Sequence, residues 1–337
     1  MRKLNNSIDI FKKYTLFKIG YYRMSIDKTR DPYFILAYHG ITDKIRNPVI
    51  DKWAVTAKEL SEHIEFLQKD FEIVTLDTLL ELVKNNKKLN KPCLVITFDD
   101  GFENIYLNAY PLLRGKKIPF LVAFPSGLLG TSRTIWTVEL DIITQLSSLG
   151  EIFIPSANGL PDIVFPLRNK EERIRASIEI RRIAMPVGGD YCCKIADSLI
   201  EQYGFDNYNN LIDEYPYFKM MSVPQAQEMV LNGVEPAVHG RFHLPLNNAD
   251  DSTLKNEIVE SRRELSEKLG VKDIGHFCLC HGASSVKAIE LIKQTGYKSC
   301  LTSEKPGRVK YGDDMYELKR FESNKNILNL VSLLAKE

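Results

Sequence analysis

The stretch that most constrains this 337-residue chain is Leu94-Val-Ile-Thr-Phe-Asp-Asp-Gly101. Its apolar and β-branched residues predict a buried strand, and that strand ends in two adjacent carboxylates and a glycine. Neighbouring side chains of a strand point to opposite faces, but the turn at Gly101 allows both carboxylates to lie at the strand end. Because buried carboxylates repel each other and are costly to desolvate, we expect positive charge beside Asp99 and Asp100.

Composition excludes several classes of protein. The chain is 44% apolar and 26% charged, as soluble globular proteins are, and its net charge of +1 gives no field that would attract nucleic acid. The six cysteines have the spacing of neither a disulfide framework nor a four-cysteine zinc site, which predicts reduced thiols. We see no signal-peptide core and no apolar run of about 18 residues, so the sequence predicts a cytoplasmic protein.

The N-terminal segment differs in charge from the rest of the chain. Residues 1–30 carry a net charge of +6, while the remainder carries −5. Aromatic and aliphatic residues recur among the lysines at helical spacing, which predicts a basic amphipathic helix within an extension of residues 1–32. Such a helix can make peripheral contact with an anionic membrane through residues 1–30, or it can pack its aromatic stripe on the main domain. We favour packing.

The order of predicted elements indicates one barrel with an insertion. In residues 33–130 and 221–337, strands alternate with helices, a pattern typical of a parallel sheet or barrel with right-handed crossovers. Residues 131–220 break that rhythm and are predicted to form a mainly helical insertion, or lid, on the face where the strands end. A separate small helical domain is the alternative. Residues 136–146 and 171–203 are expected to be helical, with polar connections around 155–161 and 206–217.

Histidines gather after the predicted strands. The chain has only six histidines, and four of them directly follow a predicted strand: His39, His239, His243 and His281. The C-terminal ends of all strands in a parallel barrel share one face, and active sites form there. We therefore expect these four imidazoles to lie near Asp99 and Asp100. The prediction rests on the clustering of these four histidines, because a single histidine would not support it.

The residue types indicate a metal-dependent hydrolase. One carboxylate and two imidazoles form a three-ligand set for a divalent metal with a fourth position left for water. We assign Asp100, His239 and His243 to this set, with Zn²⁺ as the expected ion and Co²⁺ or Ni²⁺ as alternatives. Water activated by a metal is a nucleophile near neutral pH, and a second carboxylate, Asp99, can accept its proton.

These stretches resemble the motifs of a known family. Thr97-Phe-Asp-Asp-Gly101 resembles the first motif of the polysaccharide deacetylase family (NodB-homology domain, carbohydrate esterase family 4). His239-Gly-Arg-Phe-His243, followed by Pro245 and Leu246, resembles its second motif, and Phe277-Cys-Leu-Cys-His-Gly282 occupies the place of its third. The resemblance covers most of the chain from about residue 33 to about residue 320, outside the insertion.

The resemblance implies a fold and a chemistry. The fold is a distorted (β/α) barrel of about seven strands, here with a mainly helical insertion. The reaction is metal-dependent hydrolysis of an N-acetyl or related N-acyl group on a sugar. By position, the catalytic base falls on Asp99 and the metal ligands on Asp100, His239 and His243. A backbone N–H near His281 would stabilise the oxyanion.

The sequence departs from the family pattern in three places. Gly240 stands where the family has Ser or Thr. Residues 278–281 replace the middle of the third motif, so the arginine that would steady the base is absent from it. The late Leu-x-His motif, which supplies the general acid, is also absent, because no histidine follows His281. The candidates for the acid are therefore His281 and His39.

We interpret the chain as a metal-dependent carbohydrate N-deacetylase. The expected substrate is an N-acylated sugar, linked to a nucleotide or a lipid as an intermediate of surface polysaccharide biosynthesis. A sugar N-deformylase on the same site and a catalytically degenerate carbohydrate-binding barrel are alternatives. A nucleophilic enzyme that uses Cys280 and His281 is a fourth hypothesis, although Cys278 and Cys280 fit buried core positions better. The sugar, the acyl group and the oligomeric state stay open.

Overall fold

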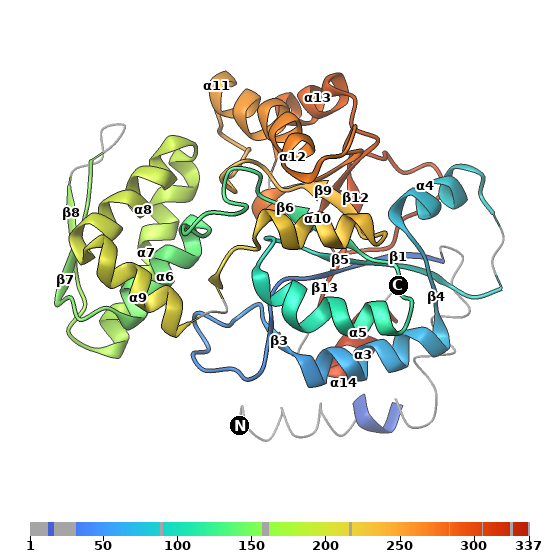
Figure 1. The fold of residues 1–337 in the computed structure, drawn as a ribbon, viewed down its shortest axis with the longest axis horizontal. Helices are drawn as coiled ribbons and strands as arrows, with labels where there is room; N and C mark the ends of the chain where they lie inside the picture. Colours follow the sequence, from blue (N-terminus) through green and yellow to red (C-terminus); the bar gives the residue numbers. More distant parts are fainter. Residues whose placement is uncertain are drawn as a thin grey trace.

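The protein consists of a closed sheet surrounded by helices, with a lobe of helices on one side (Figure 1). This computed structural model describes residues 13–16, 32–87, 90–156, 162–215, 218–282, 284–304, 306–323 and 326–335. Every pairing within the main sheet is parallel. Its strands are β1 (Tyr33–Tyr38), β4 (Glu72–Ile73), β5 (Cys93–Phe98), β6 (Leu121–Phe124), β9 (Glu235–Val238), β10 (His276–Cys278), β11 (Ser299–Thr302), β12 (Leu318–Lys319) and β13 (Phe321–Glu322).

One short stretch closes the sheet into a barrel. The strand order is β12-β11-β10-β9-β6-β5-β1-β13, with β4 paired to β5 beside this path. Only Arg320 separates β12 from β13, yet Leu318 pairs with Leu301 of β11 while Phe321 pairs with Leu36 of β1. Taken together, β12 and β13 form one strand that joins both ends of the sheet, which makes seven barrel strands. The prediction of a distorted (β/α) barrel is confirmed.

Side-chain alternation separates two parts of the core. Along β5, Cys93 and Val95 belong to one buried cluster, while Leu94, Ile96 and Phe98 belong to the other. The first cluster contains small residues from neighbouring strands, Ala123, Ala237 and Cys278, and it fills the barrel. The second packs under the surrounding helices. All six cysteines are free thiols.

The helices around the barrel follow sequence signals. Thr56 caps α3 through a capping box with Glu59, and Ser222 caps α10 through a capping box with Gln225. Amphipathic stripes turn their apolar sides to the sheet. The helices are α3 (Ala57–Asp70), α4 (Leu76–Lys84), η1 (Ile105–Ala109) running into α5 (Tyr110–Gly115), α10 (Val223–Leu231), α11 (Asp251–Leu254) running through η3 (Lys255–Glu260) into α12 (Ser261–Leu269), α13 (Val286–Thr295) and α14 (Ile327–Leu334). Smaller elements are the paired strands β2 (Ile41–Thr42) and β3 (Val55–Thr56), and the turn η4 (Cys280–Gly282).

The predicted insertion forms the lobe at the left of Figure 1. It contains α6 (Trp136–Leu146), the antiparallel pair β7 (Glu151–Ile154) and β8 (Ile163–Pro166), α7 (Lys170–Val187), α8 (Asp190–Tyr203) and α9 (Phe205–Glu214). Its domain boundaries and its role as a lid stay predictions.

One expectation for this lobe was wrong. Residues 171–203 are helical as predicted, and Gly188 and Gly189, with positive φ angles of 68° and 53°, separate α7 from α8. Residues 155–161 lie between the paired strands β7 and β8, as a connection does, but most of residues 206–217 fall in α9. The strand pair is stabilised by burial of Ile152 and Ile154 on one side, a signal too short to recognise in sequence.

Little of the N-terminal extension is described. Residues 13–16 form a helical turn, and the Lys13 amine donates a hydrogen bond to Asn329 Oδ1 of α14 at 2.9 Å. The rest of the predicted amphipathic helix lies outside the described residues. Among the helices that the structure describes, none combines the length and the hydropathy that crossing a bilayer requires.

Candidate active site

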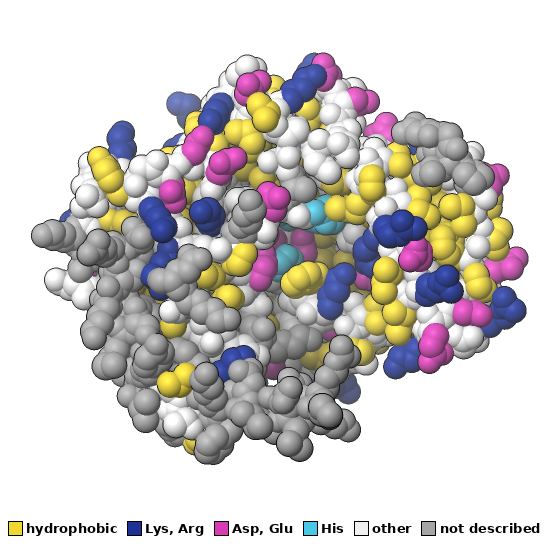
Figure 2. Space-filling view, turned by 180° about the vertical axis from the view of Figure 1, so that it is seen from behind, with side chains coloured by type: hydrophobic (Ala, Val, Ile, Leu, Met, Phe, Trp, Pro, Cys, Tyr) yellow, Lys and Arg dark blue, Asp and Glu magenta, His cyan; other side chains and the backbone are white. Residues whose placement is uncertain are grey.

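A pocket of about 360 Å³ lies where the barrel strands end, between the barrel and the helical lobe. Figure 2 shows histidine and acidic side chains at the bottom of this hollow. The structure brings together every residue that the sequence singled out for the site: His39, Asp99, Asp100, His239, His243 and His281. Their chemical roles stay predictions.

The turn after β5 presents the two carboxylates. Asp100 and Gly101 both have left-handed backbone conformations, with φ angles of 73° and 64°. His243 and His281 share this conformation, with φ angles of 59° and 57°. Each non-glycine residue in such a conformation costs on the order of 1 kcal/mol or more, and strain of this kind is typical of functional sites.

Asp100 faces two imidazoles. Its Oδ1 atom lies 3.4 Å from His239 Nε2 and 3.3 Å from His243 Nε2, yet this buried oxygen has no hydrogen-bond partner. His239 Nδ1 lies 2.8 Å from the carbonyl oxygen of Cys278, so Nδ1 carries the donated proton and Nε2 is directed at Asp100. One carboxylate oxygen and two imidazole nitrogens that converge without satisfying each other fit a divalent metal.

The pKa shifts of Asp100, His239 and His243 show which charges this part of the site favours. Burial would raise the pKa of Asp100, but the His239 and His243 imidazoles hold it well below its usual value. Burial would lower the pKa of His239, but Cys280 and the carboxylates Asp99 and Asp100 raise it well above its usual value. Burial lowers the pKa of His243. The site therefore favours a positive charge beside the carboxylates.

Cys280 is a poorer third ligand than Asp100. Its Sγ atom and one ligand atom each of His239 and His243 lie within 4.8 Å of one another. However, Sγ is 3.9 Å from His239 Nδ1, the nitrogen already bonded to Cys278, and it donates to the His239 carbonyl at 3.2 Å. Burial also raises the pKa of the thiol. The same facts disfavour Cys280 as a nucleophile.

The two candidates for the general acid have different surroundings. His39 Nδ1 lies 3.7 Å from Glu322 Oε2, and the His39 ring stacks on Trp53 with centroids 5.8 Å apart. The His281 ring meets the His243 ring edge-on at 4.6 Å. Enclosure by the pocket walls, and then the His243 charge, lower the pKa of His281 well below its usual value.

A second group of carboxylates and histidine lies at the opposite end of the barrel. Asp77, Glu235 and His276 are close enough to hold an ion. However, the Lys298 amine donates to both oxygens of Asp77 at 2.8 and 2.7 Å, and Glu235 accepts the backbone N–H of Leu76 at 2.7 Å. Protein groups thus satisfy these carboxylates, so the group is structural.

Comparison with known proteins finds similarity to one family. The family model "Polysaccharide deacetylase" matches residues 198–300, a segment that contains His239, His243 and His281. This segment of the chain is similar to the polysaccharide deacetylases. A Bacillus subtilis (strain 168) protein, YxkH, named for the same activity, is 31% identical over 81 residues, which are 24% of this chain and 27% of that protein. The match therefore spans about a quarter of that relative's length.

Solved deacetylases share the fold. The Streptococcus pyogenes deacetylase PplD, solved with acetate, covers 90% of this chain and 98% of its own at 14% identity and a TM-score of 0.57. IcaB from Ammonifex degensii covers 90% and 97% at 16% identity and a TM-score of 0.55. The de-N-acetylase of Aggregatibacter actinomycetemcomitans covers 89% and 99% at 16% identity and a TM-score of 0.53.

An arginine from a distant part of the chain pairs with Asp99. Arg320 donates to both oxygens of Asp99, at 2.8 and 2.7 Å, and to Thr97 Oγ1 at 3.3 Å. Only 1% of the Arg320 side chain and 3% of the Asp99 side chain are exposed. Burial would raise the pKa of Asp99, but Arg320 and then His239 keep it below its usual value. Sequence analysis missed Arg320, which follows Leu318 by two residues and so shares its side of the strand with this buried residue.

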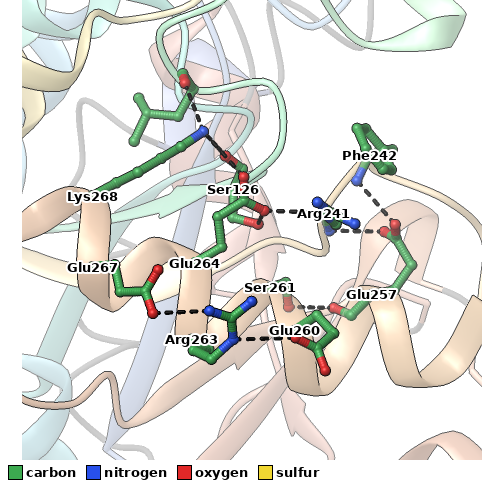
Figure 3. A network of polar contacts seen from close by, with 11 residues as sticks. Ser126, Arg241, Phe242, Glu257, Glu260, Ser261, Arg263, Glu264, Glu267 and Lys268 are labelled. Carbon is green, nitrogen blue, oxygen red and sulfur yellow. Dashed lines mark hydrogen bonds and ion pairs between the residues drawn. The ribbon is translucent and has the colours of Figure 1, made fainter.

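A buried glutamate holds the histidine loop. Glu257 accepts the backbone N–H groups of Arg241, Phe242 and Leu244 at 3.0, 3.0 and 3.2 Å (Figure 3). A Cβ atom on Gly240 would lie 2.3 Å from Glu257 Oε2, so glycine leaves room for this carboxylate. Burial raises the pKa of Glu257 to about 7. Its signal in the sequence is a charged residue within the apolar stripe of a helix.

The side chain of Arg241 also anchors this loop. Arg241 Nε donates to Glu264 Oε2 at 3.0 Å, and the same oxygen accepts Ser126 Oγ at 3.1 Å. Figure 3 shows Glu257 and Glu264 holding the loop from one helix face, with Lys268 reaching Ser126. The spacing between His239 and His243 is thus fixed by α12 and η3 as well as by the loop itself.

Arg320→Met should destabilise the protein by about 3 kcal/mol, because it leaves Asp99 buried without its counter-charge. The wild-type pair stabilises the folded state above the unfolded pKa of Asp99, near 4, and loses that effect as the pH falls through the lower folded pKa. Thermal unfolding measured across a range of pH gives both the stability lost in the variant and the pH dependence of the wild-type pair. Arg320→Met with Asp99→Asn should recover stability but not activity. Equal stability of Arg320→Met and wild type would contradict this account.

Glu257→Gln should loosen the histidine loop, because an amide cannot accept three N–H groups as the carboxylate does. We expect a loss of about 2 kcal/mol of stability and faster amide hydrogen exchange at residues 239–246, measured by mass spectrometry. Glu260→Gln on the same helix is the matched control and should leave that exchange unchanged. Unchanged exchange in Glu257→Gln would show that the loop does not depend on this carboxylate.

Proposed function

We propose that the chain is a metal-dependent hydrolase that removes an N-acetyl, or another N-acyl, group from a sugar. The observation that carries the proposal is the convergence of Asp100, His239 and His243 beside an arginine-paired Asp99 in a single pocket. Kinship with the polysaccharide deacetylases supports the substrate class. Acetate in the Streptococcus pyogenes structure makes acetyl the first acyl group to test.

Asp99 and Asp100 have separate roles in this proposal. Asp100, His239 and His243 would hold the metal, most suitably Zn²⁺, with Co²⁺ or Ni²⁺ as alternatives. A bound divalent metal supplies a Lewis acid and lowers the pKa of water. Asp99 accepts the proton of the attacking water, since Arg320 keeps its carboxylate ionised near neutral pH. A backbone N–H near His281 is proposed to stabilise the oxyanion.

We assign the general acid to His39. The leaving amine needs a proton, and His39 lines the pocket with its Nδ1 atom 3.7 Å from Glu322 Oε2. His281 is unsuited to this role because the lowered pKa keeps its ring neutral. Stacking on Trp53 orients the His39 ring toward the pocket that both residues line.

We also propose the form in which the sugar is bound. The substrate is a sugar linked to a nucleotide or a lipid, as in surface polysaccharide assembly. Release of acetate indicates an N-acetyl substrate, and release of formate indicates an N-formyl substrate. The cytoplasmic location expected from the sequence stays a prediction.

Protein purified without added metal should contain about one equivalent of a divalent transition metal, measured by inductively coupled plasma mass spectrometry. Asp100→Ala should lose it, because two imidazoles alone bind weakly. Asp77→Ala, in the group at the opposite end of the barrel, is the matched control and should retain it. If wild type neither contains metal nor takes up zinc, cobalt or nickel, the hydrolytic proposal fails and a binding role replaces it.

His39→Gln should lower kcat for an N-acetyl sugar about 100-fold, because amide hydrolysis needs a protonated leaving group. The same variant should hydrolyse 4-nitrophenyl acetate nearly as fast as wild type, since nitrophenolate leaves without a proton. His281→Gln serves as the comparison and should retain most amide hydrolysis. The opposite ranking of these two variants would move the acid to His281.

A further inference from the structure

The outer wall of the active-site pocket carries one lysine that forms no ion pair among the described residues. Arg320 pairs with Asp99, Arg181 pairs with Asp141, and Glu322 lies 3.7 Å from His39, while Asp100 belongs to the candidate metal set. Lys52 also lines this pocket, and within the described residues its amine forms no ion pair. The floor of the pocket therefore carries Asp99 and the candidate metal ligands, and the outer wall carries the Lys52 amine.

Arg181 strengthens this positive field without being available for a ligand. Its guanidinium is held by Asp141, by the Thr137 carbonyl at 2.8 Å and by Ser177. Burial, and next the Arg181 charge, lower the pKa of the Lys52 amine, while Asp141 acts in the opposite direction more weakly. The potential at the amine is thus net positive before any ligand arrives, and an anion at this position would relieve it.

The segment that carries Lys52 is held in place. The Asp51 carboxylate is buried and accepts the backbone N–H groups of Arg46 and Asn47 at 2.6 and 2.9 Å. Next to it, the Trp53 side chain is 55% exposed and lies nearly parallel to the His39 ring, at 28°. An exposed aromatic ring at the mouth of a ligand pocket offers a flat apolar surface for a sugar ring, with the amine beside it.

From this arrangement we infer that Lys52 and Trp53 form a subsite for the phosphate-bearing end of an N-acyl sugar phosphate or diphosphate. The inference rests on the proposed function and narrows its substrate. The N-acyl group lies toward Asp99 and Asp100, the sugar lies near Trp53, and the phosphate oxygens accept hydrogen bonds from the Lys52 amine. A neutral polysaccharide would leave this amine with the Trp53 ring, whose centroid lies 6.0 Å away, but without an anionic partner.

The test is binding of matched sugars to the full chain by isothermal titration calorimetry with a chelator present, so that phosphate cannot bind a metal. The probes are N-acetylglucosamine and N-acetylgalactosamine, each as the neutral methyl glycoside and as the 1-phosphate. The 1-phosphates should bind about tenfold more tightly than the glycosides, as expected for a charge-assisted hydrogen bond. Lys52→Met should remove this preference without weakening the binding of the glycosides.

Lys116→Met is the matched control, because Lys116 is exposed and precedes β6 at the far end of the strands. It should leave both affinities unchanged. Equal affinity for the 1-phosphate and the glycoside, a preference that survives in Lys52→Met, or no binding of any phosphorylated sugar would each overturn the inference. A UDP sugar and a prenyl diphosphate sugar, compared in the same assay, distinguish a nucleotide source from a lipid source of the diphosphate.

Acyl release separates failure of this inference from failure of the proposed function. With metal restored, release from the glycosides and the 1-phosphates at equal kcat/KM, unaffected by Lys52→Met, would overturn the subsite and keep the hydrolase. Tighter binding of the 1-phosphates with no acetate or formate released from any probe would support the subsite and contradict the hydrolase.

Discussion

The buried ion pair between Asp99 and Arg320 is the interaction on which both the barrel and the site depend. Arg320 is the single residue between β12 and β13, so the side chain that satisfies Asp99 belongs to the stretch that joins the two ends of the sheet. Either charge alone would be buried without a partner, at a cost of several kcal/mol. The stretch that closes the barrel therefore also supplies the charge that keeps the proposed base ionised.

This pair also explains why two adjacent carboxylates can differ in role. Arg320 donates to both oxygens of Asp99, so a metal would have to displace a guanidinium to bind there. Asp100 has no such partner, and its Oδ1 atom faces two imidazoles instead. In the proposed mechanism, this single arginine therefore reserves one carboxylate for proton transfer and leaves the other as the metal ligand. The positive charge expected beside the carboxylates from sequence has two sources, Arg320 and the candidate metal set.

Features carried by local patterns could be predicted from the sequence, and features set by long-range contacts could not. The alternation of strands and helices predicted a parallel sheet or barrel, and the family resemblance narrowed this prediction to a distorted barrel. The histidines after predicted strands indicated the residues gathered in its pocket. Arg320 meets Asp99 across 221 residues, and this contact depends on β13 pairing with β1, which no local pattern encodes. Glu257 was missed for a related reason, because its partners are backbone groups of a loop rather than side chains.

Chemistry and recognition are supplied by different parts of this chain. The strand ends hold Asp99, Asp100 and the histidines at positions fixed by the sheet. The opposite wall comes from the segment around Lys52 and Trp53 and from helices α6 and α7 of the inserted lobe. Changes in that wall can alter which sugar reaches the carboxylates while the strand ends stay as they are. Under the proposed function, the charges of the wall select the substrate, since the floor with Asp99, Asp100 and the histidines is compatible with any N-acyl sugar.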